Sequence, residues 1–135
     1  MKWWTMICFR KIKEEDFDKV KEILLEENIS NLQVEGIIYV VIENDEILGV
    51  GKVKEENKKW FLEYLITRKN KRGNRLGDGL LRVLANNLFR NGIDKLYCQE
   101  KNEFLLKKGF RKNDENLYEL NIEELFDHNC NNCGG

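Results

Sequence analysis

The sequence predicts a single α/β domain with a mixed, mostly antiparallel sheet flanked by helices. Three observations support this fold class. Apolar runs of strand length follow one another closely in the first half, a longer segment in the second half has an apolar stripe at helical spacing, and a further strand-length run comes after it. A chain of 135 residues suffices for one domain and buries roughly two-thirds of its unfolded-chain surface.

The first half reads as a strand, a helix and a three-strand meander. Residues 6–10 are a short strand candidate. The acidic residues 14–16 complement a helix dipole, and apolar side chains at helical spacing follow them. The nearly continuous apolar run at 37–42 suits a strand buried on both faces. Turns at 44–45 and 57–59 then separate it from strands at 47–53 and 60–67.

The second half begins with a helix and ends in short elements. Its helical stripe consists of Leu76, Leu80, Leu81, Leu84 and Leu88, and Gly92 is a plausible C-terminal stop. We expect a strand at 95–98, a short helix at 103–108 and a pair of strands within 110–120. With the fifth strand parallel to the fourth, this order leaves a gap where the two strands diverge.

The turn between the fourth strand and the long helix is the most informative segment. Backbone N–H groups at a helix N-terminus bind anions when little side-chain bulk covers them. Glycines at 73, 77 and 79 reduce that bulk, and five cations lie within eight residues: Arg68, Lys69, Lys71, Arg72 and Arg75. The spacing fits neither a P-loop nor a dinucleotide-binding fingerprint. The segment therefore predicts a pyrophosphate cradle of another kind.

The residues 72–77, Arg-Gly-Asn-Arg-Leu-Gly, closely resemble the Arg/Gln-x-x-Gly-x-Gly/Ala motif of the GNAT superfamily of N-acetyltransferases. The resemblance extends to the strand and helix within 7–25 and to the Lys-Lys-Gly-Phe run at 107–110, and so to nearly the whole chain. Arg75 stands where the family usually has its first glycine. A positive φ angle there would be strained by about 1 kcal/mol.

The resemblance implies a GNAT-like fold over residues 1–122, with a tail at 123–135. It also implies acetyl-coenzyme A as co-substrate, with its pantetheine arm in the gap between the fourth and fifth strands. The residues that the motif and its neighbours assign to cofactor binding are Leu65, Ile66, Thr67, Arg72, Gly73, Asn74, Arg75, Leu76, Gly77, Asp78 and Asn102. For Asn102 a helix N-cap is an alternative role.

Acetyl transfer to an amine needs a base for the amine proton and a donor for the thiolate. Glu63 lies two residues before Leu65, hence on the same face of the strand by simple alternation, and is the preferred base. Glu100 is the second candidate. Tyr97 or Tyr64 could donate the proton, because Phe104 and Leu105 occupy the positions where many relatives have a tyrosine. Packing or solvated roles remain alternatives for all four candidates.

The cysteines leave several roles open. Cys98 could form a covalent intermediate, but no histidine lies near it in the sequence, and a buried strand cysteine is the simpler interpretation. In the tail, Cys130 and Cys133 have zinc-site spacing and His128 could be a third ligand. A redox dithiol or an incidental pair are the other possibilities, and the sequence does not choose among them.

Composition limits the classes of partner. A net charge of −1 from 23 basic and 24 acidic side chains does not suggest nucleic-acid binding, and no apolar stretch reaches membrane-spanning length. We therefore expect a cytoplasmic protein, monomeric or homodimeric. Four acidic residues in the segments expected to form the acceptor site hint at a cationic amine: Glu26, Glu27, Asp114 and Glu115.

The function predicted is N-acetyl transfer from acetyl-coenzyme A to a primary amine of a small molecule or protein, by direct attack in a ternary complex. A non-catalytic acyl-coenzyme A sensor of the same fold is the alternative. An RNA-binding module that uses the basic turn is a weaker third possibility, because stacking aromatic residues are not interleaved with the cations.

Overall fold

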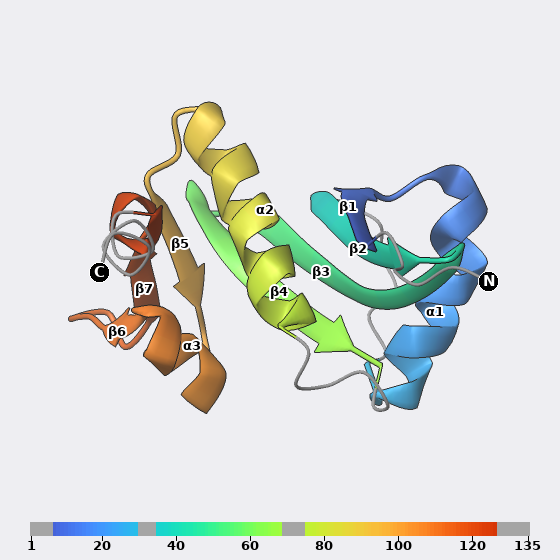
Figure 1. The fold of residues 1–135 in the computed structure, drawn as a ribbon. Helices are drawn as coiled ribbons and strands as arrows, with labels where there is room; N and C mark the ends of the chain where they lie inside the picture. Colours follow the sequence, from blue (N-terminus) through green and yellow to red (C-terminus); the bar gives the residue numbers. More distant parts are fainter. Residues whose placement is uncertain (1–6, 30–34, 69–74, 127–135) are drawn as a thin grey trace.

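A computed structural model describes residues 7–29, 35–68 and 75–126. These residues form one seven-stranded mixed sheet in the order β1-β2-β3-β4-β5-β7-β6, with helices on both faces (Figure 1). The predicted fold class is confirmed. No helix of the described part is long and apolar enough to cross a membrane.

The first four strands pair antiparallel in chain order: β1 (Ile7–Lys11), β2 (Ile37–Glu43), β3 (Glu46–Glu56) and β4 (Lys59–Thr67). Both hairpin turns have two consecutive residues with positive φ, Asn44 and Asp45 in one, Asn57 and Lys58 in the other. Such turns match the right-handed twist of the strands that they join. The predicted meander and its turns are therefore confirmed.

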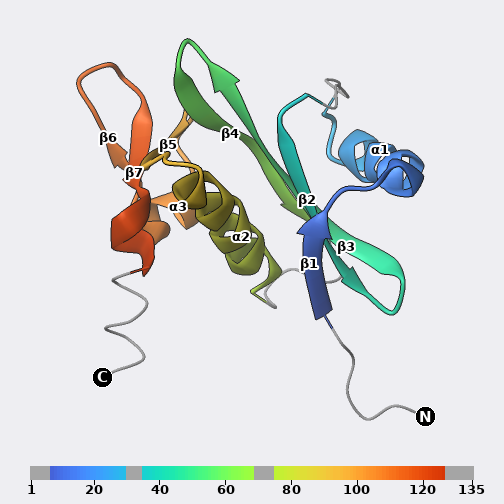
Figure 2. The same ribbon diagram turned by 90° about the horizontal axis from the view of Figure 1, so that it is seen from above.

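Two helices cover opposite faces of the sheet (Figure 2). The helix α1 (Phe17–Glu26) follows a short 3-10 turn, η1 (Glu14–Asp16), and packs against β2 and β3 through Val20, Ile23 and Leu24. The longer α2 (Leu76–Arg90) buries its leucine stripe on the other face, against β3, β4 and β5. The helix ends at Arg90, and Gly92 has a φ of 85°, as its predicted role as a helix stop requires.

The sheet opens between β4 and β5 (Lys95–Cys98). Their described residues pair in parallel at one position, Phe61 opposite Tyr97, so most of β4 has no ladder partner on that side. Strand β5 pairs instead with β7 (Tyr118–Asn121), which in turn pairs with β6 (Arg111–Lys112). The predicted divergence of the fourth and fifth strands is thus present.

The helix α3 (Glu103–Lys108) lies beside this opening, between β5 and β6 in the chain. Asn102 caps the N-terminus of α3 and Gly109 caps its C-terminus, with a φ of 115° that favours glycine. A helical turn at 122–126 follows β7 and buries Ile122 and Leu125 in the core cluster shared with α2. Packed structure therefore continues beyond residue 122.

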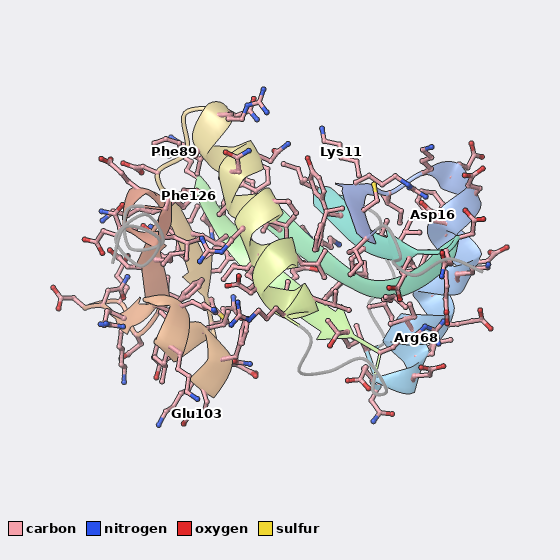
Figure 3. The ribbon with its side chains drawn as sticks, viewed as in Figure 1. Lys11, Asp16, Arg68, Phe89, Glu103 and Phe126 are labelled. Atoms are coloured by element: carbon pink, nitrogen blue, oxygen red, sulfur yellow. The ribbon has the colours of Figure 1, made fainter. Side chains whose placement is uncertain are left out.

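An ion pair connects β1 to the residue that precedes α1. Arg10 contacts both carboxylate oxygens of Asp16, at 2.7 Å and 3.2 Å, and the Lys13 N–H donates to Asp16 Oδ2 at 2.8 Å. Asp16 is 6% exposed and is visible at the start of α1 in Figure 3. The hydrogen bond from Arg10 lowers the pKa of Asp16 despite the opposing effect of burial. This carboxylate therefore stabilises the fold only while it is ionised.

We expect Asp16→Asn to lower the free energy of unfolding by about 2 kcal/mol, because it leaves a partly buried guanidinium without its anion. Since the folded-state pKa lies below the usual value of 3.8, the contribution is present above that pH and is lost as the pH falls below it. Urea unfolding at pH 7 and at pH 3 measures both effects. The exposed Asp18, on the same helix, is the control: Asp18→Asn should cost well under about 1 kcal/mol. Equal losses in the two variants would contradict the prediction.

Candidate active site

A cleft of about 580 Å³ occupies the opening between β4 and β5. The β4 backbone forms one wall, the first turn of α2 closes one end, and the segment from Cys98 through α3 forms the other wall. The described residues that line it are Leu62, Glu63, Tyr64, Leu65, Thr67, Arg75, Leu76, Gly77, Asp78, Cys98, Glu100, Lys101, Asn102, Phe104, Leu105 and Lys108.

Most of the predicted cofactor residues come together in this cleft. Leu65, Thr67, Arg75, Leu76, Gly77, Asp78 and Asn102 all line it. Ile66 does not: it is 8% exposed and packs in the core cluster on the α1 face, because neighbouring residues of a strand face opposite sides. Arg72, Gly73 and Asn74 lie outside the described residues. Asn102 also caps α3, since its Oδ1 accepts a hydrogen bond from the Leu105 N–H at 3.1 Å, and its contact with the cofactor stays a prediction.

The first turn of α2 is built with little side-chain bulk towards the cleft. Arg75 precedes the helix with a φ of 62°, so the left-handed backbone that a glycine would favour is present at an arginine. A Cβ at Gly77 would meet the Phe104 ring at 3.5 Å and no other described residue within ordinary contact distance. The helix N-terminus is therefore open towards the cleft at Gly77.

Gly79 has a different role from the one that the sequence suggested. A Cβ at this position would come within 2.3 Å of the Phe9 ring on β1. Gly79 thus allows α2 to pack closely on β1 and does not contribute to the cradle. The expectation that all three glycines of the turn serve anion binding is wrong at Gly79.

Cations at the cleft come partly from unexpected positions. Arg75 is among the predicted cations of the turn, whereas Lys101 and Lys108 come from the segment around α3. Arg68, in contrast, turns back to β3, where its Nε donates to the Ile47 carbonyl at 2.9 Å (Figure 3). The sequence contains the lysines next to α3, but only the fold shows that α3 lies across from α2.

Asp78 places a carboxylate in this cationic surface. It pairs with Lys108 through Oδ1 at 2.6 Å and with Arg82 through Oδ2 at 2.9 Å. Burial acts to raise the pKa of Asp78, but the hydrogen bonds from Lys108 and Arg82 lower it overall. The ionised carboxylate links α2 to the end of α3, and its charge is compensated by the two cations.

A second cleft, of about 310 Å³, opens beside the first. It is lined by Lys54, Glu56, Phe61, Leu62, Glu63, Cys98, Gln99 and Glu100. Four residues line both clefts: Leu62, Glu63, Cys98 and Glu100. The two spaces therefore share a boundary at the point where β4 and β5 separate, and the two predicted base candidates both stand there.

The position of Glu63 depends on a β-bulge. Lys52 is opposite Tyr64 whereas its neighbour Val53 is opposite Leu62, so Glu63 is an extra residue on β4. As a result Leu62 packs with the α2-side core and Tyr64 with the α1-side core, although they are two residues apart.

The Glu63 side chain lies on the same face of the sheet as Tyr64, the face that α1 covers. Its carboxylate lies 3.2 Å from Lys52 Nζ and 4.0 Å from Lys54 Nζ, and these lysines alternate with the α2-facing Val53. Leu65 packs on the α2 side. The expectation that Glu63 and Leu65 share a face is therefore wrong, because the bulge interrupts the two-residue period.

The tyrosine and cysteine candidates differ in their access to the clefts. Tyr97 lines neither cleft and packs against the Phe61 ring at a centroid distance of 5.8 Å. Tyr64 lines the larger cleft, and burial together with the charge of Glu63 raises its pKa to about 12. Burial also raises the pKa of the Cys98 thiol, whose Sγ donates to the Glu100 carbonyl at 3.3 Å. Both groups therefore remain protonated at neutral pH.

The residues expected to attract a cationic amine do not line either cleft. Glu26 and Glu27 are at the end of α1, Asp114 is in the β6–β7 turn, and Glu115 pairs with Lys59 at 3.7 Å. The carboxylates at the smaller cleft are instead Glu56, Glu63 and Glu100. The sequence alone does not indicate a role for Glu56, because a glutamate next to a turn is usually a solvent-exposed side chain.

No group of three or more His, Cys, Asp or Glu side chains in the described residues is arranged to hold a metal ion. His128, Cys130 and Cys133 lie outside the described residues. The hypotheses for the tail therefore stay predictions.

Comparison with solved structures shows similar folds. An acetyltransferase of the GNAT family from Staphylococcus aureus Mu50 superposes with a TM-score of 0.72 and 17% identity, over 87% of this chain and 99% of that one. A GNAT family acetyltransferase from Brucella melitensis in complex with acetyl-CoA gives 0.71 and 14%, over 86% and 88%. The ribosomal-protein-S18-alanine N-acetyltransferase from Escherichia coli gives 0.69 and 14%, over 87% and 94%.

Sequence comparison gives the family directly. No curated protein matches the chain. Residues 1–110 match the model of the acetyltransferase (GNAT) family, and this span includes β1 to β5, both long helices and α3. With the fold and the opening between β4 and β5 in agreement, the chain belongs to the GNAT family of acetyltransferases.

Proposed function

We propose that the protein transfers an acetyl group from acetyl-coenzyme A to a primary amine by direct attack in a ternary complex. The observation that supports this most strongly is the meeting of two clefts at Glu63, Cys98 and Glu100. One cleft suits the acyl donor and the other the amine, so the two reactants would meet without a covalent enzyme intermediate.

The larger cleft fits the donor. Its volume of about 580 Å³ is in the range of small-molecule sites, and the open α2 N-terminus at Gly77 suits a pyrophosphate. Arg75, Lys101 and Lys108 line the same cleft and add positive charge for the phosphate groups. Among the described residues β4 pairs with β5 only at Phe61, so the backbone groups of Leu65, which lines the cleft, are placed to bind the pantetheine arm.

The bound thioester would supply an acyl carbon whose bond to sulfur breaks as the bond to the amine nitrogen forms. Glu63 accepts the proton that the attacking nitrogen loses, directly or through one water. The departing thiolate takes up a proton, and Tyr64 is a donor in the correct protonation state at neutral pH. Leu62 and Leu105 add apolar surface to the walls of the larger cleft.

The smaller cleft favours an amine with a second positive charge. The smaller cleft is lined by three carboxylates and one lysine, Lys54, so its lining has a net negative charge. The attacking nitrogen must be neutral when it reacts and does not need this charge. Glu56 and Glu100 are exposed and form no ion pair with the described residues. They are thus available to a distal cationic group of the acceptor.

We expect a diamine to have a higher kcat/KM than an uncharged amine of equal length, and an amino acid with a distal carboxylate to have a lower one. The gain should be a few-fold, since exposed ion pairs contribute about 0.2–1 kcal/mol. Steady-state assays of coenzyme A release with the three matched amines measure this. A preference for the carboxylated acceptor would contradict the assignment of the cleft charge.

The first test separates the enzyme from a non-catalytic sensor. Both would show a thermal stabilisation by acetyl-coenzyme A, whereas only the enzyme would release coenzyme A in the presence of an amine. Binding without turnover over a broad amine panel would favour the sensor. An absence of thermal stabilisation would reject both.

Direct attack also predicts the behaviour of Cys98. Because burial keeps its thiol protonated, we expect Cys98→Ala to keep most of the wild-type kcat. Mass spectrometry of the wild-type protein incubated with acetyl-coenzyme A alone should show no acetylated cysteine. An acetyl group on Cys98, together with an inactive Cys98→Ala variant, would establish a covalent route instead.

A further inference from the structure

Lys52 is an unusual residue of this core. It is fully buried, and among the described residues it is the one charged side chain with 0% exposure. On the same face of the sheet its cross-strand neighbours are Ile38 of β2 and Tyr64 of β4, which are 4% and 8% exposed. A lysine is very rarely buried completely unless its charge has a partner.

Stability gives no reason for a lysine at this position. Removing an ammonium group from water is costly, and a well-packed apolar side chain of similar size in place of a buried charge is often neutral or stabilising. The surrounding strand positions on this face hold apolar residues such as Val50 and Ile38. A residue that breaks the local pattern at a cost in stability points to a functional role.

Lys52 pairs with the carboxylate at the junction of the two clefts. Lys52 Nζ lies 3.2 Å from Glu63 Oε2, and Lys54 Nζ lies 4.0 Å from Glu63 Oε1. The Glu63 side chain is 24% exposed whereas Lys52 is 0% exposed, so the pair reaches from the core to the clefts. The bulge at Glu63 brings the two groups onto the same face.

We propose that Lys52 is a positioning residue, which holds one carboxylate oxygen of Glu63 and leaves the other to accept the amine proton. This inference rests on the proposed function. A catalytic base must keep its orientation closely, and an ammonium group packed in the core has a fixed position that an exposed lysine lacks. In the described part of the chain, the other charged or titratable groups around Glu63 are Lys54 of β3, Tyr64 of β4, and Glu56, Cys98 and Glu100, which line the smaller cleft with it.

The test is a Lys52→Met variant, which keeps an unbranched side chain of similar length and removes the charge. We expect kcat to fall at least tenfold with the KM for acetyl-coenzyme A unchanged. The melting temperature without ligand should stay close to that of the wild type, because removing the fully buried ammonium group offsets the loss of a partner for Glu63. Lys95→Met is the matched control: Lys95 pairs with Glu119 at 2.9 Å across β5 and β7, outside both clefts.

A double variant shows whether Lys52 acts through Glu63. If it does, Lys52→Met combined with Glu63→Gln is no slower than Glu63→Gln alone. A crystal structure of Lys52→Met should show the Glu63 carboxylate displaced from its wild-type position. The Lys52→Arg variant, which keeps the charge, should recover part of the lost kcat if it folds.

Three results would overturn the inference. A lower melting temperature with an unchanged kcat would make Lys52 a structural residue only. If the fold-losses in kcat of the two single variants multiply in the double variant, Lys52 acts independently of Glu63. If the wild-type protein binds acetyl-coenzyme A but Glu63→Gln is fully active, the assigned base is wrong, and so is the role of Lys52. Failure of the wild type to acetylate any amine is a different result, because it would reject the proposed function itself.

Discussion

A Gly77→Glu variant is expected to lose the thermal stabilisation that acetyl-coenzyme A gives to the wild-type protein. Gly77 lines the larger cleft at the first turn of α2, where, of the residues that the structure describes, only the Phe104 ring would lie close to a Cβ, at 3.5 Å. A glutamate there would extend into the cleft and place a negative charge where a pyrophosphate is expected. Bulk and like-charge repulsion would then act together against binding.

The magnitude of this effect is large enough to measure easily. Ligand at a hundredfold excess over its dissociation constant stabilises a protein by about 2.7 kcal/mol, which is several degrees in Tm for a domain of this size. Differential scanning fluorimetry with and without acetyl-coenzyme A detects such a shift. For Gly77→Glu we expect no shift at the same ligand concentration.

Gly77→Ala is the matched control for this experiment. Its Cβ would make an ordinary van der Waals contact with Phe104, so the variant should keep most of the ligand-induced shift. Retention of the full shift by Gly77→Glu would mean that the cofactor does not use the N-terminus of α2. Loss of the shift in both variants would indicate a disturbed helix start and not a filled cradle.

A Glu63→Gln variant is expected to lower kcat by about 10²-fold or more, because general-base catalysis typically contributes 10²–10⁴-fold. Glutamine has nearly the same shape but cannot accept the amine proton as a carboxylate does. The stabilisation by acetyl-coenzyme A should remain, since the cofactor phosphates are expected at the other end of the cleft. Steady-state kinetics at saturating acetyl-coenzyme A give the change in kcat.

Two further glutamine variants show whether the loss is specific. Glu119→Gln removes a carboxylate that pairs with Lys95 outside both clefts, so we expect a kcat close to that of the wild type. Glu100 lines both clefts and is the other candidate base. A large loss in Glu100→Gln with little effect in Glu63→Gln would transfer the role of base to Glu100.

The local elements of the fold could be predicted from the sequence. The apolar run of β2, the leucine stripe of α2 and the turns at Asn44 and Asn57 each depend on residues close together in the chain. Backbone conformation was also predictable in one case: the motif pattern singled out Arg75, and its φ of 62° is in the left-handed region. These features follow from the periods of helices and strands and from steric limits on φ.

The members of the site were predictable only in part. The wall formed by Leu65, Thr67 and the start of α2 is nearly continuous in sequence, so a local motif is enough to predict it. The opposite wall, with Lys101, Phe104 and Lys108, depends on where α3 packs, which is a contact between distant segments. No local pattern in residues 101–108 indicates which side of the short helix faces the cleft.

By itself, the sequence determined the order of strands and helices, the opening between β4 and β5 through its family motif, and the glycine-containing start of α2 that lines the larger cleft. Only the tertiary structure decided the face of Glu63, its pairing with the buried Lys52 and the packing of Gly79 against Phe9. The physical reason is the same in each case. A bulge adds one residue to a strand without changing its composition, and a buried charge or a glycine contact depends on partners far away in the chain.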